Sequence, residues 1–387
     1  MQNKKRMIYI AIFNLFLVFV GVGLVVPIMP DLRNQMGYSG TTMGMMISIF
    51  AIAQLIASPI TGFLSDKMGR KKIIAVGMLI FAVSELIFGL AQSLPLFYFS
   101  RALGGVSAAM IMPSVTAYVA DLTNLLERPK AMGYVSAAIS GGFIIGPGLG
   151  GLVASGNIRN PFFAAAILGL FAFFITLFGL KESHPLKSVQ EEVEQKTSVY
   201  NVLKEPFFIS LFVIILISSF GLQSFESIYS VMANANFGFN TQAIALIITV
   251  SGIFALIVQI FYFDRIVQKI GEIRLIQYSF FLSAIFIALI AITRSNIVVL
   301  ISTFIVFLAF DLFRPAVTTY LSKNAGDQQG TINGLNSTFT SFGNILGPLA
   351  AGALFDVNHF FPYFVSALIL LVTGFLSLRM KKLKSNH

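Results

Sequence analysis

Five ionisable side chains lie within long apolar stretches of the sequence, and their chemistry needs an explanation first. They are Glu85, Arg101, Glu226, Asp311 and Arg314. A charge placed in the centre of a membrane costs about 2.5 kcal/mol or more, so such a residue must face a partner or a wet cavity. Ionisable residues at this depth are typical of binding sites and proton-transfer sites in membrane proteins.

Asp311 and Arg314 are three residues apart, so on a helix they share one face. The arginine favours the charged form of the aspartate, whereas burial favours the neutral form. A carboxyl group balanced between these two effects can gain and lose a proton as its surroundings change. The alternative interpretation is an ion pair with a purely structural role.

Glu226 lies in a segment that also carries a glycine, a glutamine and two serines, which makes the segment partly polar. No cationic residue is adjacent to it in the sequence. The carboxylate could bind either a proton or a cationic substrate, and competition between them is the simplest coupling mechanism. For Glu85 we expect a structural role or partial exposure at the lipid interface.

The composition indicates that lipid forms part of the protein's surroundings. Of 387 residues, 56 % are hydrophobic and only 11 % are charged, whereas soluble domains are about 25 % charged. Hydropathy predicts an all-α membrane protein with twelve spanning helices. The predicted helices start near Ile8, Thr41, Ile73, Leu96, Ala131, Pro161, Pro206, Thr241, Arg274, Ile297, Ile332 and Phe361. Cysteine is absent and the three histidines are scattered, so we expect no disulfide, no metal site and no cofactor.

The basic residues predict the orientation of these helices. The net charge of +10 would suggest a nucleic-acid partner in a soluble protein, but here it matches the positive-inside rule. Arg33, Arg159 and Arg294 fall on the outer side, and Arg101 and Arg314 lie within spans. This leaves 26 − 3 − 2 = 21 lysines and arginines on the side that holds both termini. We therefore expect both termini in the cytoplasm and no nucleic acid as a partner.

The sequence contains an internal repeat. Three short patterns recur at offsets of 202, 201 and 198 residues, which chance does not explain. The matching positions are Pro113 and Pro315, Gly142 and Gly343, and Asp66 and Asp264. We predict two six-helix halves, residues 1–181 and 206–387, joined by a polar cytoplasmic linker at 182–205. An even number of helices per half gives parallel halves related by a pseudo-two-fold axis along the membrane normal.

Several motifs resemble those of one transporter family. The loop Gly62-Phe-Leu-Ser-Asp66-Lys-Met-Gly69-Arg70 resembles the signature that major facilitator transporters carry between helices two and three. The segment Gly142-Phe-Ile-Ile-Gly146-Pro-Gly-Leu-Gly-Gly resembles the antiporter motif of that superfamily. Ser-Phe-Gly-Leu-Gln-Ser-Phe-Glu226 and Phe-Asp311-Leu-Phe-Arg-Pro are similar to segments of its Bmr/NorA group of bacterial multidrug efflux pumps.

The resemblance implies a major facilitator fold that works by alternating access. It further implies a drug:proton antiporter that exports lipophilic, often cationic drugs and dyes, such as fluoroquinolone-like and ethidium-like compounds, in exchange for protons. It assigns proton coupling to Glu226 and Asp311, with Arg314 beside Asp311, and assistance of proton transfer to Arg101. The implied gating motif, a cytoplasmic latch, comprises Gly62, Asp66, Gly69, Arg70 and Asp121. The implied antiporter motif comprises Gly142, Gly146, Pro147, Gly150 and Gly151.

We expect a substrate cavity lined by aromatic and amphipathic polar side chains. Its predicted residues are Asn14, Phe16, Gln54, Phe143, Phe225, Tyr229, Asn336, Phe339 and Asn344. A broad apolar pocket with a few acids suits flat lipophilic cations, through hydrophobic and cation–π contacts.

Other functions are less consistent with the sequence. A dedicated exporter of a single metabolite, such as a polyamine or sugar, is the alternative within transport. A membrane enzyme would need a metal cluster or a nucleophile–base pair, and a channel does not account for the duplicated halves and mid-span Gly-Pro elements. A nucleotide-binding Gly-x-x-x-x-Gly-Lys-Ser/Thr stretch is absent, so an ion gradient is the expected energy source. We expect a monomer in a bacterial cell membrane.

Overall fold

The computed structural model of the protein describes residues 2–124, 126–183, 199–324 and 328–384, and each of the twelve predicted spans corresponds to a long helix. The long helices are α1 (Gln2–Val25), α3 (Gly40–Met68), α4 (Arg70–Leu90), α5 (Leu94–Leu122), α6 (Arg128–Val153), α7 (Asn160–Gly179), α9 (Pro206–Phe237), α10 (Thr241–Ile270), α11 (Glu272–Ile292), α12 (Asn296–Asn324), α13 (Gln329–Val357) and α14 (Phe361–Lys384). Shorter elements are η1 (Val26–Ile28), α2 (Met29–Met36) and α8 (Val199–Lys204). The predicted fold class is thus confirmed.

The helices have the apolar character that a membrane requires. Eleven stretches within the described residues are long and apolar enough to cross a bilayer, and the first of them, Lys4–Met36, runs through α1, η1 and α2. The remaining long helix, α13, is enriched in asparagine, serine and threonine, which lower its hydropathy. Because polar side chains in a spanning helix must be turned toward protein or water, α13 is a candidate lining helix.

Four of the helices end at a glycine with a positive φ angle. Two of these glycines lie at equivalent positions of the internal repeat. Gly69, between α3 and α4, has φ of 102°, and Gly271, between α10 and α11, has φ of 82°. Their offset is 271 − 69 = 202 residues. The same offset pairs Asp66 with Gln268, so the predicted equivalence of Asp66 and Asp264 is wrong by one helical turn. Identity of residue type favours Asp264 as the match, whereas the turn glycine fixes the register.

The described helices fall into two compact units. The first comprises Met1–Gly37, Ile49–Glu191 and Asn240–Thr249, and the second Tyr38–Ser48, Glu192–Phe239 and Val250–His387. The beginning of α3 therefore groups with the second unit, and the beginning of α10 groups with the first. Most of the predicted linker, residues 184–198, lies outside the described residues, so the proposed boundary at 182–205 stays a prediction.

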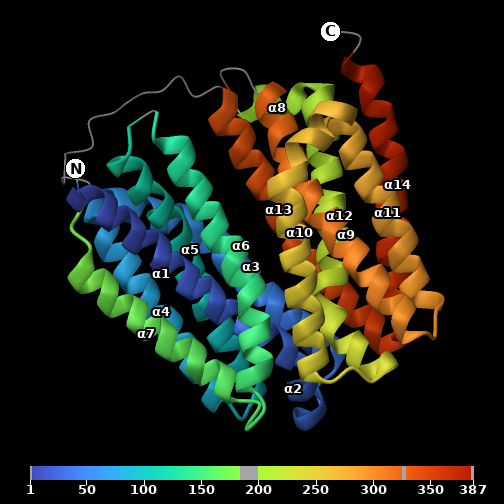
Figure 1. The fold of residues 1–387 in the computed structure, drawn as a ribbon, viewed down its shortest axis with the longest axis horizontal. Helices are drawn as coiled ribbons and strands as arrows, with labels where there is room; N and C mark the ends of the chain where they lie inside the picture. The colour runs from blue at the N-terminus through green and yellow to red at the C-terminus, as the bar shows by residue number, and fades with distance from the viewer. Residues whose placement is uncertain (1, 125, 184–198, 325–327, 385–387) are drawn as a thin grey trace. The chain divides into compact units, whose positions relative to one another are not determined.

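Equivalent helices pack together in the two units. In the first, α1 packs against α6 and α7, and α4 packs against α5 and α7. In the second, α9 packs against α13 and α14, and α11 packs against α12 and α14, as can be followed in Figure 1. The first unit's core joins α1, α4 and α5 through side chains such as Leu15, Met78, Phe81, Val115 and Tyr118. Because such apolar side chains fill the core, the polar sites described below lie on other faces of the helices.

Two carboxylates accept hydrogen bonds from the first turns of α3 and α10. The beginning of each of these helices groups with a different unit from the rest of the helix. In the second unit, Asp356 accepts hydrogen bonds from the backbone N–H groups of Gly40 at 2.5 Å and Thr41 at 2.8 Å, and from the Thr41 hydroxyl at 2.6 Å. In the first unit, the Thr241 hydroxyl donates to Asp31. Anions are favoured at helix N-termini because the first N–H groups have no helical partner there.

Candidate functional site

Glu226 and Arg314 form an ion pair in the second unit. Glu226 lies in the C-terminal half of α9, and Arg314 lies in α12. The arginine Nη2 is 2.9 Å from Glu226 Oε1 and 3.0 Å from Oε2. The glutamate side chain is 25 % exposed and the arginine 56 %, so the pair is only partly buried. Arg314 is thus the cationic partner of Glu226, which has no cationic residue adjacent to it in the sequence.

Asp311 lies one turn before Arg314 on α12. The expected direct pairing of Arg314 with Asp311 is not seen, because within the described residues the arginine's ion pair is with Glu226. Pro315 follows the arginine and has no backbone N–H, so the Asp311 carbonyl lacks its usual helical donor. The carboxylates of Glu226 and Asp311 thus both lie near the Arg314 guanidinium group. The α12 backbone can bend at this point.

The aromatic residues beside Glu226 are packed inside the second unit. Phe225 is fully buried, with ring centroids 5.6 Å from Tyr229, 5.7 Å from Phe310 and 5.2 Å from Tyr363. Tyr229 is 2 % exposed. The prediction that Phe225 and Tyr229 line the cavity is therefore wrong for this structure. Their side of α9 faces α12 and α14, and sequence position alone does not give the rotation of a helix about its axis.

Asn14 also does not line a cavity in this structure. Its side chain is fully buried, and its Nδ2 donates to the Thr176 hydroxyl at 2.9 Å. That hydroxyl donates in turn to the Ala172 carbonyl at 2.9 Å. Asn14 thus joins α1 to α7, and such polar contacts between helices hold membrane proteins together.

The other six predicted cavity residues keep part of their surface exposed. Phe16, Gln54 and Phe143 belong to the first unit, and Asn336, Phe339 and Asn344 belong to the second. Phe143 is 43 % exposed and contacts Phe19 edge-to-face at 4.9 Å. These residues stay candidates for substrate contact.

Arg101 has a buried partner that the sequence did not reveal. In the first unit its Nη2 is 2.8 Å from Glu85 Oε1, and its guanidinium carbon lies 4.2 Å from the centroid of the Phe88 ring. Glu85 is only 2 % exposed, so the pairing supports the structural role foreseen for it and rules out partial lipid exposure. Breaking such a buried pair leaves an uncompensated charge and is costly.

The predicted gating residues meet around Arg70 in the first unit. Arg70 forms ion pairs with Asp66, one turn earlier, and with Asp121 of α5, whose Oδ2 lies 3.4 Å from the arginine Nε. Gly69 provides the turn into α4, whereas Gly62 has no neighbour within 4 Å of an added Cβ among the described residues. A network of several charges around one arginine is more stabilising than an isolated surface pair.

Glu182 is a further member of this network that the sequence analysis placed in the linker. Its Oε1 accepts the backbone N–H of Arg70 at 2.8 Å, and its Oε2 accepts that of Lys71 at 3.2 Å. The carboxylate thus satisfies the first N–H groups of α4 and interacts favourably with the helix dipole.

The second unit contains a charge-inverted copy of the Arg70–Asp121 pair. Glu272, at the start of α11, forms an ion pair with Lys323 near the end of α12. The offsets are 272 − 70 = 202 and 323 − 121 = 202 residues, equal to that of the turn glycines. A search for identical residues misses this pair, whereas a search for complementary charges at one offset finds it.

Comparison with known proteins identifies the family. A sequence model of the Major Facilitator Superfamily matches residues 11–348 and 211–385. The chain belongs to this superfamily. It is 46 % identical to multidrug resistance protein 2 of Bacillus subtilis (strain 168) over 391 residues, which covers 99 % of this chain and 98 % of that protein. It is 38 % identical to the quinolone resistance protein NorA of Staphylococcus aureus over 366 residues, covering 94 % and 93 %.

A solved transporter structure supports the fold of this superfamily member. The nucleoside transporter NupG aligns with a TM-score of 0.82 and 15 % identity, covering 99 % of this chain and 100 % of that one. At this identity the likeness concerns the fold.

The antiporter-motif glycines of this superfamily member pack α6 tightly against α1. An added Cβ on Gly146 would lie 2.7 Å from Gly23 Cα and 2.7 Å from the Val20 carbonyl oxygen. One on Gly142 would lie 2.6 Å from Phe19 Cβ. Gly150 faces the backbone of Leu24, Gly151 faces Ala245, and the Pro147 ring lies beside Gly23. Small residues permit such close helix crossings in membranes.

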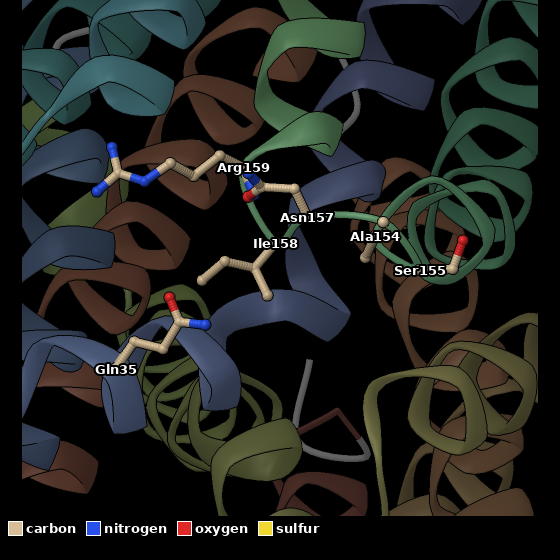
Figure 2. A pocket seen from close by; sticks show the side chains of 7 residues that line it. Gln35, Ala154, Ser155, Asn157, Ile158 and Arg159 are labelled. Atoms are coloured by element: carbon tan, nitrogen blue, oxygen red, sulfur yellow. The ribbon is translucent and has the colours of Figure 1, made fainter.

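An open hollow of about 510 Å³ lies on the first unit, where α6 leads into α7. Figure 2 shows its lining, which consists of Gln35 and the segment 154–159. These residues include neither an acid nor an aromatic side chain. The hollow therefore lacks the groups that would attract a lipophilic cation.

Proposed function

We propose that this protein is a proton-coupled multidrug efflux antiporter of the bacterial cell membrane. It exports lipophilic, often cationic drugs and dyes by alternating access. Its membership of the superfamily makes it a transporter rather than an enzyme, and full-length relatives are named for multidrug and quinolone resistance. The observation that carries the proton-coupling proposal is the placement of Glu226 and Asp311 around Arg314.

The charge balance of this cluster supports competition between protons and a cationic drug. With both carboxylates ionised, the two acids and one arginine carry −1 − 1 + 1 = −1. One proton brings the cluster to zero and a second brings it to +1. A cation is attracted to the first state and repelled by the last, so each bound proton weakens drug binding. Binding of a drug and binding of protons therefore exclude one another, as antiport requires.

The stoichiometry determines which gradient drives export. Exchange of one monovalent cation for one proton moves no net charge and uses the pH gradient alone. Exchange for two protons also uses the membrane potential, which contributes about 2.3 kcal/mol per charge at 100 mV. Two acids near one arginine make the two-proton cycle feasible.

Other residues have supporting roles in this function. Arg101, held by Glu85, assists proton transfer, and the partly exposed aromatic and amide side chains of each unit contact the drug. Arg70 with Asp66 and Asp121 acts as a cytoplasmic latch. Both termini lie in the cytoplasm, and the protein works as a monomer.

A screen of unrelated substrates tests the proposed function. The full-length protein would be expressed in a drug-sensitive bacterium, and efflux of ethidium, a fluoroquinolone and a rhodamine dye would be measured with and without an uncoupler. We expect uncoupler-sensitive export of at least two chemotypes. Export of a single chemotype, or of a polyamine alone, would favour the dedicated metabolite exporter instead.

A further inference from the structure

Buried hydroxyl groups collect in the second unit next to Glu226. Tyr229 of α9 is 2 % exposed, and Tyr363 and Ser366 of α14 are fully buried. Within the described part of the chain, the hydroxyls of these three side chains lack a hydrogen-bond partner of good geometry. A buried hydroxyl without a partner is unfavourable, and native proteins usually satisfy it with protein groups or ordered water.

The two tyrosine rings pack against one phenylalanine ring. Phe225 lies 5.6 Å from the Tyr229 ring and 5.2 Å from the Tyr363 ring. Thr303 of α12 lies one turn before Phe307, whose ring centroid is 5.7 Å from that of Tyr229, and its hydroxyl donates to the Val299 carbonyl at 2.8 Å. We refer to Tyr229, Thr303, Tyr363 and Ser366 as the hydroxyl cluster.

Ser366 belongs to this cluster by helix geometry. It lies three residues after Tyr363 and four before Leu370, which places all three on one side of α14. Leu370 contacts Gly221 of α9, where an added Cβ would lie 3.2 Å from the leucine, and Tyr363 contacts Phe225. Ser366 therefore lies on the face of α14 that packs against α9.

The cluster lies between Glu226 and one end of the helices. Tyr229 is three residues beyond Glu226, about 4.5 Å along the helix axis. Tyr363 is the third residue of α14. His359, just before α14, has its Nδ1 3.0 Å from the Asn236 amide oxygen near the end of α9, so these two helix ends are adjacent. In the proposed topology this is the outer end, where protons enter an antiporter driven by an inward gradient.

We propose that the hydroxyl cluster binds ordered water and forms a proton route from the outer end of the second unit to Glu226. Each hydroxyl can both donate and accept a hydrogen bond, so a chain of hydroxyls and water passes protons without holding a charge in the membrane. A buried water needs about two to four polar partners, and this cluster supplies them. The assignment of a proton route rests on the proposed function of Glu226, whereas the binding of water does not.

Radiolytic labelling in ¹⁸O-labelled water tests the water directly. Brief X-ray exposure forms hydroxyl radicals from bound water, and mass spectrometry locates the oxygen gained by nearby side chains. In the full-length protein we expect Tyr229 and Tyr363 to be labelled well above Phe212, which is equally buried. Labelling of both tyrosines no higher than that of Phe212 would overturn the proposal.

Two serine variants of α14 provide the matched comparison. Ser366→Ala removes a hydroxyl without a partner, whereas Ser377→Ala removes a buried one that donates to the Gly374 carbonyl at 2.6 Å within its own helix. We expect Ser366→Ala to lower the labelling of Tyr363 several-fold and Ser377→Ala to leave it unchanged. Equal labelling in the two variants would contradict the assignment of Ser366 to the cluster.

Transport separates the route from a merely structural role. In proteoliposomes we expect Ser366→Ala and Tyr363→Phe to slow proton-driven ethidium transport several-fold, because each removes one hydroxyl from the chain that passes the proton. Ethidium affinity and ethidium–ethidium exchange without a gradient should match wild type. Labelled tyrosines with unchanged proton-driven rates would refute the route. If wild type itself shows no proton-driven transport, the proposed function fails and the route fails with it, while the labelling still decides whether water is bound.

Discussion

Replacement of Gly146 by alanine should force α1 and α6 apart. The added Cβ would lie 2.7 Å from Gly23 Cα and from the Val20 carbonyl oxygen, whereas ordinary contacts begin near 3.4 Å. The shortfall is 3.4 − 2.7 = 0.7 Å, and both neighbours are backbone atoms that no side-chain rotation can move. Overpacking of this kind costs about 1–3 kcal/mol.

Gly141→Ala is the matched control on the same helix. Its added Cβ would lie 3.6 Å from the Phe16 ring, an ordinary contact. Both variants gain about 1 kcal/mol of helix propensity over glycine, so their difference isolates the steric effect. We therefore expect Gly146→Ala to be about 1–3 kcal/mol less stable than Gly141→Ala.

The chain contains no cysteine and no tryptophan, which rules out thiol-reactive dyes and tryptophan fluorescence as stability probes. Circular dichroism at rising temperature in one detergent would compare the two purified variants. Gly146→Ala should unfold at a clearly lower temperature than Gly141→Ala. Equal unfolding temperatures would refute the argument that the antiporter-motif glycines are there because α1 and α6 cross so closely.

Two further predictions concern ion pairs. Glu272→Lys should impair ethidium efflux and the double variant Glu272→Lys/Lys323→Glu should restore it, because the charges of this ion pair attract in either order; failure of the double variant to recover would contradict a role for that attraction. Glu85→Ala should reduce the yield of folded protein sharply, because breaking a buried ion pair costs about 3–5 kcal/mol, whereas Glu85→Gln keeps a hydrogen-bond acceptor for Arg101. Equal yields of both variants by size-exclusion chromatography would contradict the pairing.

The fold followed from the sequence because each helix carries its own signal. A long apolar stretch predicts a membrane span wherever it occurs, and the glycines that end α3 and α10 can be identified in the sequence. The repeat at an offset near 202 residues then fixed which helices are equivalent. Even the polar character of α13 is visible in its asparagines and serines.

The side-chain partners could not be predicted, because they depend on how each helix is rotated about its axis. Glu226 and Arg314 are 88 residues apart in the chain, and Asn14 and Thr176 are 162 apart. Nothing local distinguishes an asparagine that faces a cavity from one that faces the next helix. The sequence therefore predicts Asn14 in the cavity, whereas in the structure its side chain points toward α7.

The central claim is that drug export and proton entry are one coupled exchange at Glu226 and Asp311. Purified protein would be reconstituted in liposomes that contain a pH-sensitive dye, and ethidium would be added on one side. We predict ethidium uptake accompanied by proton movement in the opposite direction, with the proton signal lost in Glu226→Gln and in Asp311→Asn. Ethidium transport without proton counter-movement, or equal proton movement in wild type and both variants, would contradict it.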